Sequence, residues 1–218
     1  GAWPSATPNL PAPAPLGQAL RVQTLKAECV LDAKAILGEG PVWRAATQDL
    51  VWVDIESARV CCFNPATGEN QTWDVGEKPG LAVPTKRGDL ILGTSGGFVR
   101  FDLATGELSP IIDPEQDLPN NRFNDGKVDP EGRLWAGTMG VNEVPNVGSL
   151  YRLNRNLSAD KLFDQVSVSN GMVWTSDQKL FYYIDSPTRR VDVFDCDMAG
   201  GTLSNRRTAF ELPEGMGY

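Results

Sequence analysis

The sequence predicts an all-β protein folded as a β-propeller, and three repeating features carry this prediction. First, the 218-residue chain contains many runs of strand length that are rich in β-branched and aromatic residues and bounded by Gly, Pro, Asp or Asn. Second, the strongest runs begin at a regular interval, with spacings of 40, 44 and 46 residues, at Leu50, Leu90, Leu134 and Leu180. A period of roughly 40–50 residues with about four strands per unit is typical of a propeller blade.

The third feature is the repeated turn between runs. The segments 64–69 (NPATGE) and 102–107 (DLATGE) lie 38 residues apart. In these turns Gly68 and Gly106 suit the left-handed position that closes a hairpin. A β-sandwich or a closed barrel would not need a four-strand period with repeated turn chemistry, so the propeller is favoured over both.

Four repeat units fit the chain and are expected to form blades at residues 37–74, 79–113, 123–165 and 168–212. The partial propeller is thus expected over residues 31–218, after a Pro/Ala-rich leader (1–30) that is expected to be disordered or extended. Because propellers commonly have six to eight blades, either this propeller is small or the chain stops early. No apolar run approaches the roughly 18 residues of a membrane helix, which predicts a soluble protein with no membrane partner.

Composition excludes several kinds of chemistry. The chain has no histidine, which removes Ser-His-Asp and Cys-His catalysis and histidine-based zinc sites. Its net charge of −8 argues against nucleic-acid binding but is compatible with a cation site. No CxxC pair occurs, so reduced, packed cysteines are expected, which favours a cytoplasmic location; they are Cys29, Cys61, Cys62 and Cys196.

Three blades place an oxygen-bearing side chain at the same repeat position. The first strand of a propeller blade lines the central channel, about ten residues before the repeated leucine. Glu39 lies 11 residues before its leucine, and Asn124 and Asn170 each lie 10 before theirs, whereas the second blade has Pro79-Gly80 there. These side chains are therefore expected to converge around one axis.

Carboxylate and carboxamide oxygens suit Ca²⁺, Mg²⁺ or Mn²⁺, or Zn²⁺ in an oxygen environment. The competing interpretation is that each Asn simply forms a turn with the residues that follow it. Arg122 lies two residues before Asn124, on the same strand face, and could bind an anionic or hydroxyl-rich ligand. Alternatively, Arg122 pairs with an acidic residue at the surface.

Other repeated residues are expected to be structural. Trp43, Trp135 and Trp174 occupy related blade positions and are predicted to lie in the core between blades rather than to form a sugar platform. Asp54 and Asp185 end equivalent runs (VWVD and YYID) and are predicted to accept hydrogen bonds from turn amides.

Four segments carry a family resemblance: LGEGPVW (37–43), RFNDGKVDPEGRLWAGTM (122–139), SNGMVW (169–174) and YYIDSPTRRVDVFD (182–195). Over about residues 31–218 the chain resembles the senescence marker protein / gluconolactonase / luciferin-regenerating family. The resemblance implies a six-bladed β-propeller with one divalent metal in the channel, Ca²⁺ above all. It also implies hydrolysis of a small-molecule sugar lactone by metal-activated water, or, alternatively, calcium or ligand binding without catalysis, as in regucalcin-like propellers.

The resemblance also implies roles for individual residues. Glu39 and Asn170 match the family's metal ligands, and Arg122 and Asn124 match its substrate-contacting pair. The family's third ligand and supposed general base is an Asp in a later motif, which is expected to lie beyond Tyr218, with Glu214 as a less favoured substitute. We therefore expect the chain to represent about four of six blades and, alone, to be an inactive or weakly active fragment of the enzyme.

Overall fold

The computed structural model describes residues 26–213 and residue 215. Its strands form four antiparallel sheets, each with four strands that are hydrogen-bonded to one another in sequence order. The only helical elements among the described residues are two short 3-10 turns, η1 (Val141–Glu143) and η2 (Ser186–Thr188). None of the helical segments in the described part is long and apolar enough to cross a membrane. The predicted all-β propeller architecture, with about four blades, is confirmed.

Each sheet is one blade. The first contains β1 (Gly38–Arg44), β2 (Asp49–Asp54), β3 (Arg59–Asn64) and β4 (Glu69–Asp74). The second contains β5 (Leu81–Pro84), β6 (Leu90–Thr94), β7 (Gly97–Phe101) and β8 (Leu108–Ile112). The third contains β9 (Asn121–Val128), β10 (Leu134–Gly140), β11 (Gly148–Leu153) and β12 (Ala159–Val166). The fourth contains β13 (Ser169–Trp174), β14 (Leu180–Asp185), β15 (Arg190–Asp197) and β16 (Thr202–Glu211).

All four sheets belong to one compact unit that begins at Ala33. Of the expected leader, 1–30, only residues 26–30 are described, and they form neither helix nor strand. The expectation for residues 1–25 lies outside the described part of the chain.

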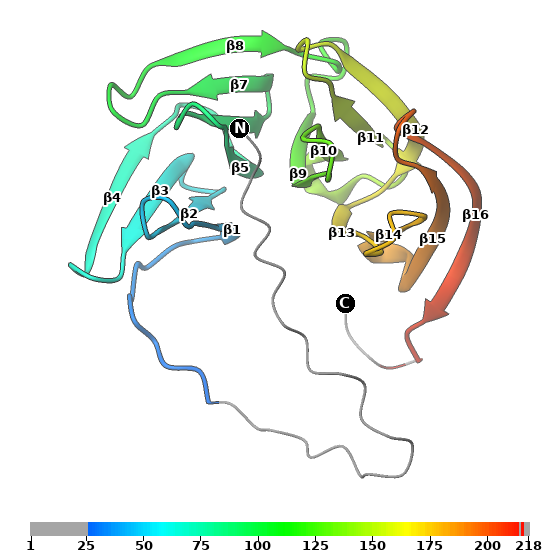
Figure 1. Cartoon of the computed structure of the whole chain (residues 1–218), viewed down its shortest axis with the longest axis horizontal. Helices are drawn as coiled ribbons and strands as arrows, with labels where there is room; N and C mark the ends of the chain where they lie inside the picture. Colours follow the sequence, from blue (N-terminus) through cyan, green and yellow to red (C-terminus); the bar gives the residue numbers. More distant parts are fainter. Residues whose placement is uncertain (1–25, 214, 216–218) are drawn as a thin grey trace. The chain divides into compact units, whose positions relative to one another are not determined.

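The first strand of each blade is its innermost strand. In Figure 1, β1, β5, β9 and β13 lie toward the middle of the arrangement, and β4, β8, β12 and β16 lie on the outside. The innermost strands of consecutive blades contact one another, β1 with β5, β5 with β9 and β9 with β13. We call the end of the blades at which these innermost strands begin the rim.

The hydrophobic core lies between consecutive blades, in three clusters. The first cluster joins β2 to β6. In the second, Phe98 of β7 packs against Phe123 of β9 with ring centroids 4.4 Å apart. In the third, Trp135 of β10 packs against Phe181 of β14 at 5.2 Å. Because burying a side chain of this type stabilises a fold by roughly 1.5–3 kcal/mol, these contacts are what hold neighbouring blades together.

The predicted tryptophan positions are only partly correct. Trp135 is fully buried, and Trp174 is half-buried against it at 5.2 Å. Trp43 is 47% exposed, so the prediction that it lies in the core is wrong. The reason is that the core forms between blades, and Trp43 belongs to none of the three clusters in the described residues.

The repeated turns have the predicted geometry. Gly68 and Gly106 have φ angles of 74° and 75°, which is the left-handed region. The side chains of Asn64 and Asp102, which begin the two turns, each accept a backbone hydrogen bond from the residue two positions later, at 2.9 and 2.8 Å. The two turns are thus closed by the same local chemistry.

Asp54 and Asp185 accept amide hydrogen bonds, as predicted. Asp54, at the end of β2, accepts from the backbone N–H groups of residues 36 and 37 at 3.2 and 2.9 Å. Asp185, at the end of β14, accepts from residues 167 and 168 at 3.0 and 2.8 Å. Each carboxylate therefore ties the loop that leads into the innermost strand to the end of the second strand.

In the second and third blades the positions of carboxylate and donor are exchanged. The carboxylate lies in the loop before the innermost strand, and its donors lie in or just after later strands. Glu77 lies in the loop before β5 and accepts hydrogen bonds from Thr94 Oγ1 at 2.9 Å and from the N–H of Gly96 at 2.7 Å. Glu115 lies in the loop before β9 and accepts from Thr138 Oγ1 at 2.9 Å and from the Tyr151 hydroxyl at 3.0 Å. In all four blades a carboxylate thus holds the loop at the rim.

None of the four cysteines, all of which lie in the described part, forms a disulfide. Cys61 is buried, and burial raises the pKa of its thiol to about 11. Cys62 and Cys196 are half-buried, whereas Cys29 is exposed, so the expected packing holds for three of the four.

Candidate metal and substrate site

The three oxygen-bearing candidates each lie at a β-bulge near the rim. The pairing of β1 with β2 shifts just after Glu39, and the pairing of β13 with β14 shifts just after Asn170. In β9 the extra residue, left without a partner in β10, is Asn124. A bulge bends its strand and re-aims a side chain. One polar side chain is therefore redirected at this level in the first, third and fourth blades.

The second blade carries Gly80 at the matching place. A Cβ atom on Gly80 would overlap the carbonyl oxygen of Phe123 and lie 2.8 Å from the Cα of Asn124. A Cβ on Gly40 would lie 3.7 Å from the carbonyl oxygen of Gly80. The innermost strands of the first three blades therefore approach closely at the level of the candidate residues.

Arg122 and Asn124 form a fixed pair. Arg122 is 9% exposed, and its Nη1 donates to the carbonyl oxygen of Phe123 at 2.9 Å and to Asn124 Oδ1 at 2.8 Å. Asn124 Nδ2 donates to the carbonyl oxygen of Ser169 in β13 at 2.8 Å. Because a guanidinium only donates and a carbonyl only accepts, both ends of the Asn124 amide have an assigned direction.

The charge of Arg122 has no carboxylate within ion-pair distance in the part of the chain that the structure describes. The alternative of a surface ion pair is therefore wrong for these residues. Burial lowers the pKa of Arg122, whereas the negative charges of Glu56, Glu143 and Glu39 act in the opposite direction. A buried guanidinium that is not neutralised by an adjacent carboxylate is suited to bind a ligand oxygen.

Asn170 is oriented by a hydroxyl group. Its Nδ2 donates to Ser186 Oγ at 2.8 Å, and Ser186 begins the 3-10 turn η2 directly after β14. None of the hydrogen bonds between described residues ends on Asn170 Oδ1, so that oxygen is available to a ligand. Partners of this kind, which orient a ligating side chain, are characteristic of metal sites.

Glu39 and Asp125 contribute negative charge at the same level. The Glu39 side chain is exposed. Asp125, which follows Asn124, is half-buried and accepts a hydrogen bond from the N–H of Gly126 at 2.7 Å. Burial raises the pKa of the Asp125 carboxyl, the bond from Gly126 opposes this, and the charge of Glu39 raises the pKa further.

The available donors fit a hard divalent cation. Glu39 supplies a carboxylate and Asn170 a carboxamide oxygen, the ligand types that Ca²⁺, Mg²⁺ and Mn²⁺ prefer, and Zn²⁺ also accepts oxygen ligands. Within the described residues there is no group of three or more His, Cys, Asp and Glu side chains that could hold a metal. Coordination through Glu39 and Asn170 would therefore be completed by water, substrate or other oxygens. Glu214, the less favoured catalytic candidate, lies outside the described residues.

Sequence reasoning did not single out three residues of this region. The sequence did contain an indication that Asp125 belongs to the site, because it lies between Asn124 and Gly126 in the run that carries the family resemblance. Ser186 follows Asp185 and Ser169 precedes Asn170, but nothing in their sequence context distinguishes these serines from ordinary turn or strand residues. Their contacts become visible only in the folded chain.

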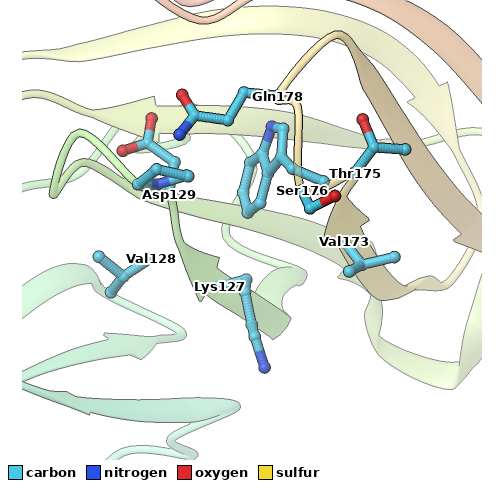
Figure 2. Close-up of a pocket in the computed structure, with 9 residues that line it drawn as sticks. Lys127, Val128, Asp129, Val173, Thr175, Ser176 and Gln178 are labelled. Carbon is cyan, nitrogen blue, oxygen red and sulfur yellow. The ribbon is translucent and has the colours of Figure 1, made fainter. Parts of the chain in front are cut away.

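A separate pocket lies between the third and fourth blades, at the far end of β9 and β13 from the rim (Figure 2). Its volume is about 350 Å³, and it is lined by Lys127, Val128, Asp129, Pro130, Val173, Trp174, Thr175, Ser176 and Gln178. The Asp129 carboxylate in its wall is already bound by Arg133 at 2.6 Å and by the Trp135 indole N–H at 2.8 Å. None of the predicted site residues lines this pocket, so it is distinct from the candidate site.

Comparison with known proteins identifies relatives over nearly the whole chain. Regucalcin from Xenopus laevis is 39% identical over 201 residues, which cover 90% of this chain and 67% of that protein. A luciferin-regenerating enzyme has a TM-score of 0.77 at 31% identity, over 81% of this chain and 61% of that one. A calcium-binding protein, regucalcin, from Agrobacterium tumefaciens has a TM-score of 0.76 at 27% identity, over 80% and 59% of the two chains.

The chain thus spans about two thirds of the length of the curated relatives and somewhat less of the solved structures. A family model described as "SMP-30/Gluconolactonase/LRE-like region" matches residues 37–218, which include all four blades. The chain therefore belongs to the SMP-30/gluconolactonase/LRE-like family.

Proposed function

We propose that this protein is a metal-dependent hydrolase of sugar lactones. The observation that carries the proposal is the Arg122–Asn124 pair, in which Arg122 is buried, Asn124 is half-buried and hydrogen bonds hold both side chains in one orientation. Glu39 and Asn170, which lie beside irregularities in the pairing of their strands, are the proposed oxygen ligands. A buried guanidinium without a carboxylate in contact is costly in a purely structural role. Binding a polar substrate would compensate that cost.

Glu39 and Asn170 would hold the cation, with Ca²⁺ favoured and Zn²⁺, Mg²⁺ or Mn²⁺ as alternatives. When bound, such a cation polarises a lactone carbonyl and activates a water molecule for attack at neutral pH. Ser186 holds the Asn170 amide so that Oδ1 can ligate. The Glu39 carboxylate contributes the negative charge that favours a cation at the rim.

Arg122 and Asn124 would bind and orient the substrate. The guanidinium donates to oxygens of the lactone, while its bond to Asn124 Oδ1 restricts its own movement. Because Asn124 is also bonded to Ser169, the pair is already ordered before substrate arrives. Ordering the catalytic groups in advance lowers the entropic cost of reaching the reactive arrangement.

Calcium binding without hydrolysis is the second candidate function. It is favoured by the structural relative from Agrobacterium tumefaciens, a regucalcin that is itself described as a calcium-binding protein. In that case the site would bind a cation and a small ligand but release the ligand unchanged.

Substitution of Glu39 by Gln tests the proposal. We expect Ca²⁺ affinity, measured by isothermal titration calorimetry, to fall by at least about ten-fold, because a direct ligand is lost and even outer-shell changes cost roughly 10–100-fold. Calcium-dependent hydrolysis of D-glucono-δ-lactone should fall in parallel. Glu69→Gln, on the outer strand β4, is the matched control and should change neither quantity.

Three results would decide between the functions. Calcium-dependent turnover that is lost in Glu39→Gln supports the lactonase. Calcium binding without turnover of any lactone by these 218 residues fits the binding protein, and it also fits the inactive fragment of the enzyme that the family resemblance implies. If the chain binds no divalent cation, or if Glu39→Gln binds as tightly as the parent, the metal site proposed here is wrong.

A further inference from the structure

Ser169 connects two of the candidate residues. Its carbonyl oxygen accepts the hydrogen bond from Asn124 Nδ2, and its chain neighbour is Asn170. Beside it, an isolated β-bridge joins Met139 of the third blade to Val168 of the fourth. The position of Ser169 therefore determines how far the Asn124 amide lies from the Asn170 amide.

The Ser169 side chain is confined within this junction. The residue has no exposed surface, and its Oγ accepts a hydrogen bond from the Tyr183 hydroxyl at 2.8 Å. On the third-blade side, a Cβ atom on Gly137 would overlap the Ser169 hydroxyl, so the hydroxyl occupies the space that any larger residue at 137 would fill. Ser169 cannot shift toward β10 without a steric clash, and it cannot shift away from Tyr183 without losing this hydrogen bond.

Tyr183 is a rigid support for this serine. It is 1% exposed, and its ring packs against Phe163 at 5.2 Å in the third hydrophobic cluster. The hydroxyl lies in a region without solvent exposure, where water cannot replace it as the donor to Ser169. Loss of this donor would leave a buried hydroxyl unsatisfied, a cost that favours a shift of the serine.

We propose that Tyr183 is a positioning residue for the metal site, which acts through Ser169 to set the spacing of Asn124 and Asn170. This inference rests on the proposed function, because it requires that Asn170 ligates a cation. Cation sites are sensitive to such spacing, since Ca²⁺–oxygen distances span only about 2.3–2.6 Å and Mg²⁺ requires near-ideal octahedral geometry at about 2.0–2.1 Å.

Substitution of Tyr183 by Phe removes the hydroxyl and retains the packed ring. The full chain, stripped with EDTA, is titrated with CaCl₂ and separately with MgCl₂ by calorimetry. We expect the Ca²⁺ Kd to rise about ten-fold, as is typical for outer-shell changes, and the Mg²⁺ Kd to rise at least as much. Thermal unfolding in EDTA measures stability of the metal-free protein separately.

Tyr151→Phe is the matched control. Tyr151 is 3% exposed, and the substitution also removes one buried hydrogen bond, to Glu115 at 3.0 Å, but Tyr151 touches neither Ser169 nor the Asn pair. Glu115 keeps its hydrogen bonds from Thr138 Oγ1 at 2.9 Å and from Asn121 Nδ2 at 3.0 Å, so the loop before β9 stays anchored in this variant. A purely structural role predicts that both variants lower the unfolding temperature in EDTA without affecting metal affinity. A positioning role predicts that only Tyr183→Phe weakens the metal, with the Ca²⁺ Kd of Tyr151→Phe within about two-fold of the parent.

If Tyr183→Phe does not fold, Ser169→Ala is the second variant, because it removes the hydroxyl but keeps the carbonyl that Asn124 binds. An unchanged Ca²⁺ Kd in the folded variant overturns the inference, and so does an equal rise in Tyr151→Phe. If the parent chain binds neither cation, the proposed function is wrong. If the parent binds and the variant binds equally well, only the positioning role of Tyr183 is wrong.

Discussion

At two positions near the rim, the close approach of the neighbouring blade leaves room only for glycine. Gly80 has no side chain because the Phe123 carbonyl of the next blade occupies that space, and Gly137 leaves room for Ser169. Neither glycine has a positive φ, so close approach rather than backbone conformation requires them. In the same way the Asn124 amide is fixed by one group that can only donate and one that can only accept.

Substitution of Gly80 by Ala should destabilise the protein by about 1–3 kcal/mol, because a methyl group must displace backbone of the neighbouring strand. The free energy of unfolding in urea measures this. Gly38→Ala is the control, since its Cβ would lie 3.4 Å from Ala35 Cβ, an ordinary contact, and its φ is also not positive. Equal effects of the two substitutions would show that the blade contact at Gly80 is unimportant.

At the scale of elements, each loop at the rim is anchored by a carboxylate. The sequence predicted Asp54 and Asp185 because both end repeated strands, so their spacing carries information. Glu77 and Glu115 were not predicted, because they lie in irregular loops. No periodic pattern there marks a side chain that folds back onto a strand. These four anchors hold the loops at the rim that lead into the innermost strands.

Asp54 should make stability depend on pH. Burial of this carboxyl acts to raise its pKa, but hydrogen bonds from Ser57, Leu37 and Ile36 outweigh that effect and lower the pKa below its ordinary value of 3.8. The resulting stabilisation is complete above about pH 3.8, where the unfolded carboxyl is ionised, and is lost as pH falls through the folded pKa.

Asp54→Asn should therefore cost about 2 kcal/mol of unfolding free energy at pH 7, and the difference from the parent should shrink as the pH falls below 3.8. Urea denaturation at several pH values measures both quantities. Asp164→Asn, at an exposed position on β12, should differ little from the parent at any pH. A cost for Asp54→Asn that stays constant down to pH 3 would contradict the assignment.

At the scale of the whole molecule, the hydrophobic clusters of the described residues each span two neighbouring blades. A blade therefore depends mainly on its neighbours, as in other repeat architectures. This also explains why Trp43 is exposed. The equivalent Trp174 is half-buried because Trp135 of the neighbouring blade packs against it. Periodicity reports that a position recurs, whereas burial depends on what packs against it.

Phe181→Ala should disrupt the cluster between the third and fourth blades and destabilise the chain by about 3–5 kcal/mol, the usual cost of removing a buried aromatic ring. Hydrogen–deuterium exchange should increase mainly in strands β9 to β16 and much less in β1 to β4. A uniform increase across all four blades would show that unfolding is fully cooperative and that the nearest-neighbour description is wrong.

The sequence by itself determined the propeller, the repeated turns and the choice of Glu39, Asn124 and Asn170 as equivalent positions. These follow from local periodicity and turn chemistry, and the metal and substrate roles of the residues stay predictions. Only the tertiary structure decided that Arg122 is buried with no carboxylate of the described residues within ion-pair distance, that Asn124 bonds a residue 45 positions away, and that Tyr183 supports Ser169. Such contacts cross from one blade to the next or depend on burial at their junction, and three-dimensional packing rather than local sequence sets them.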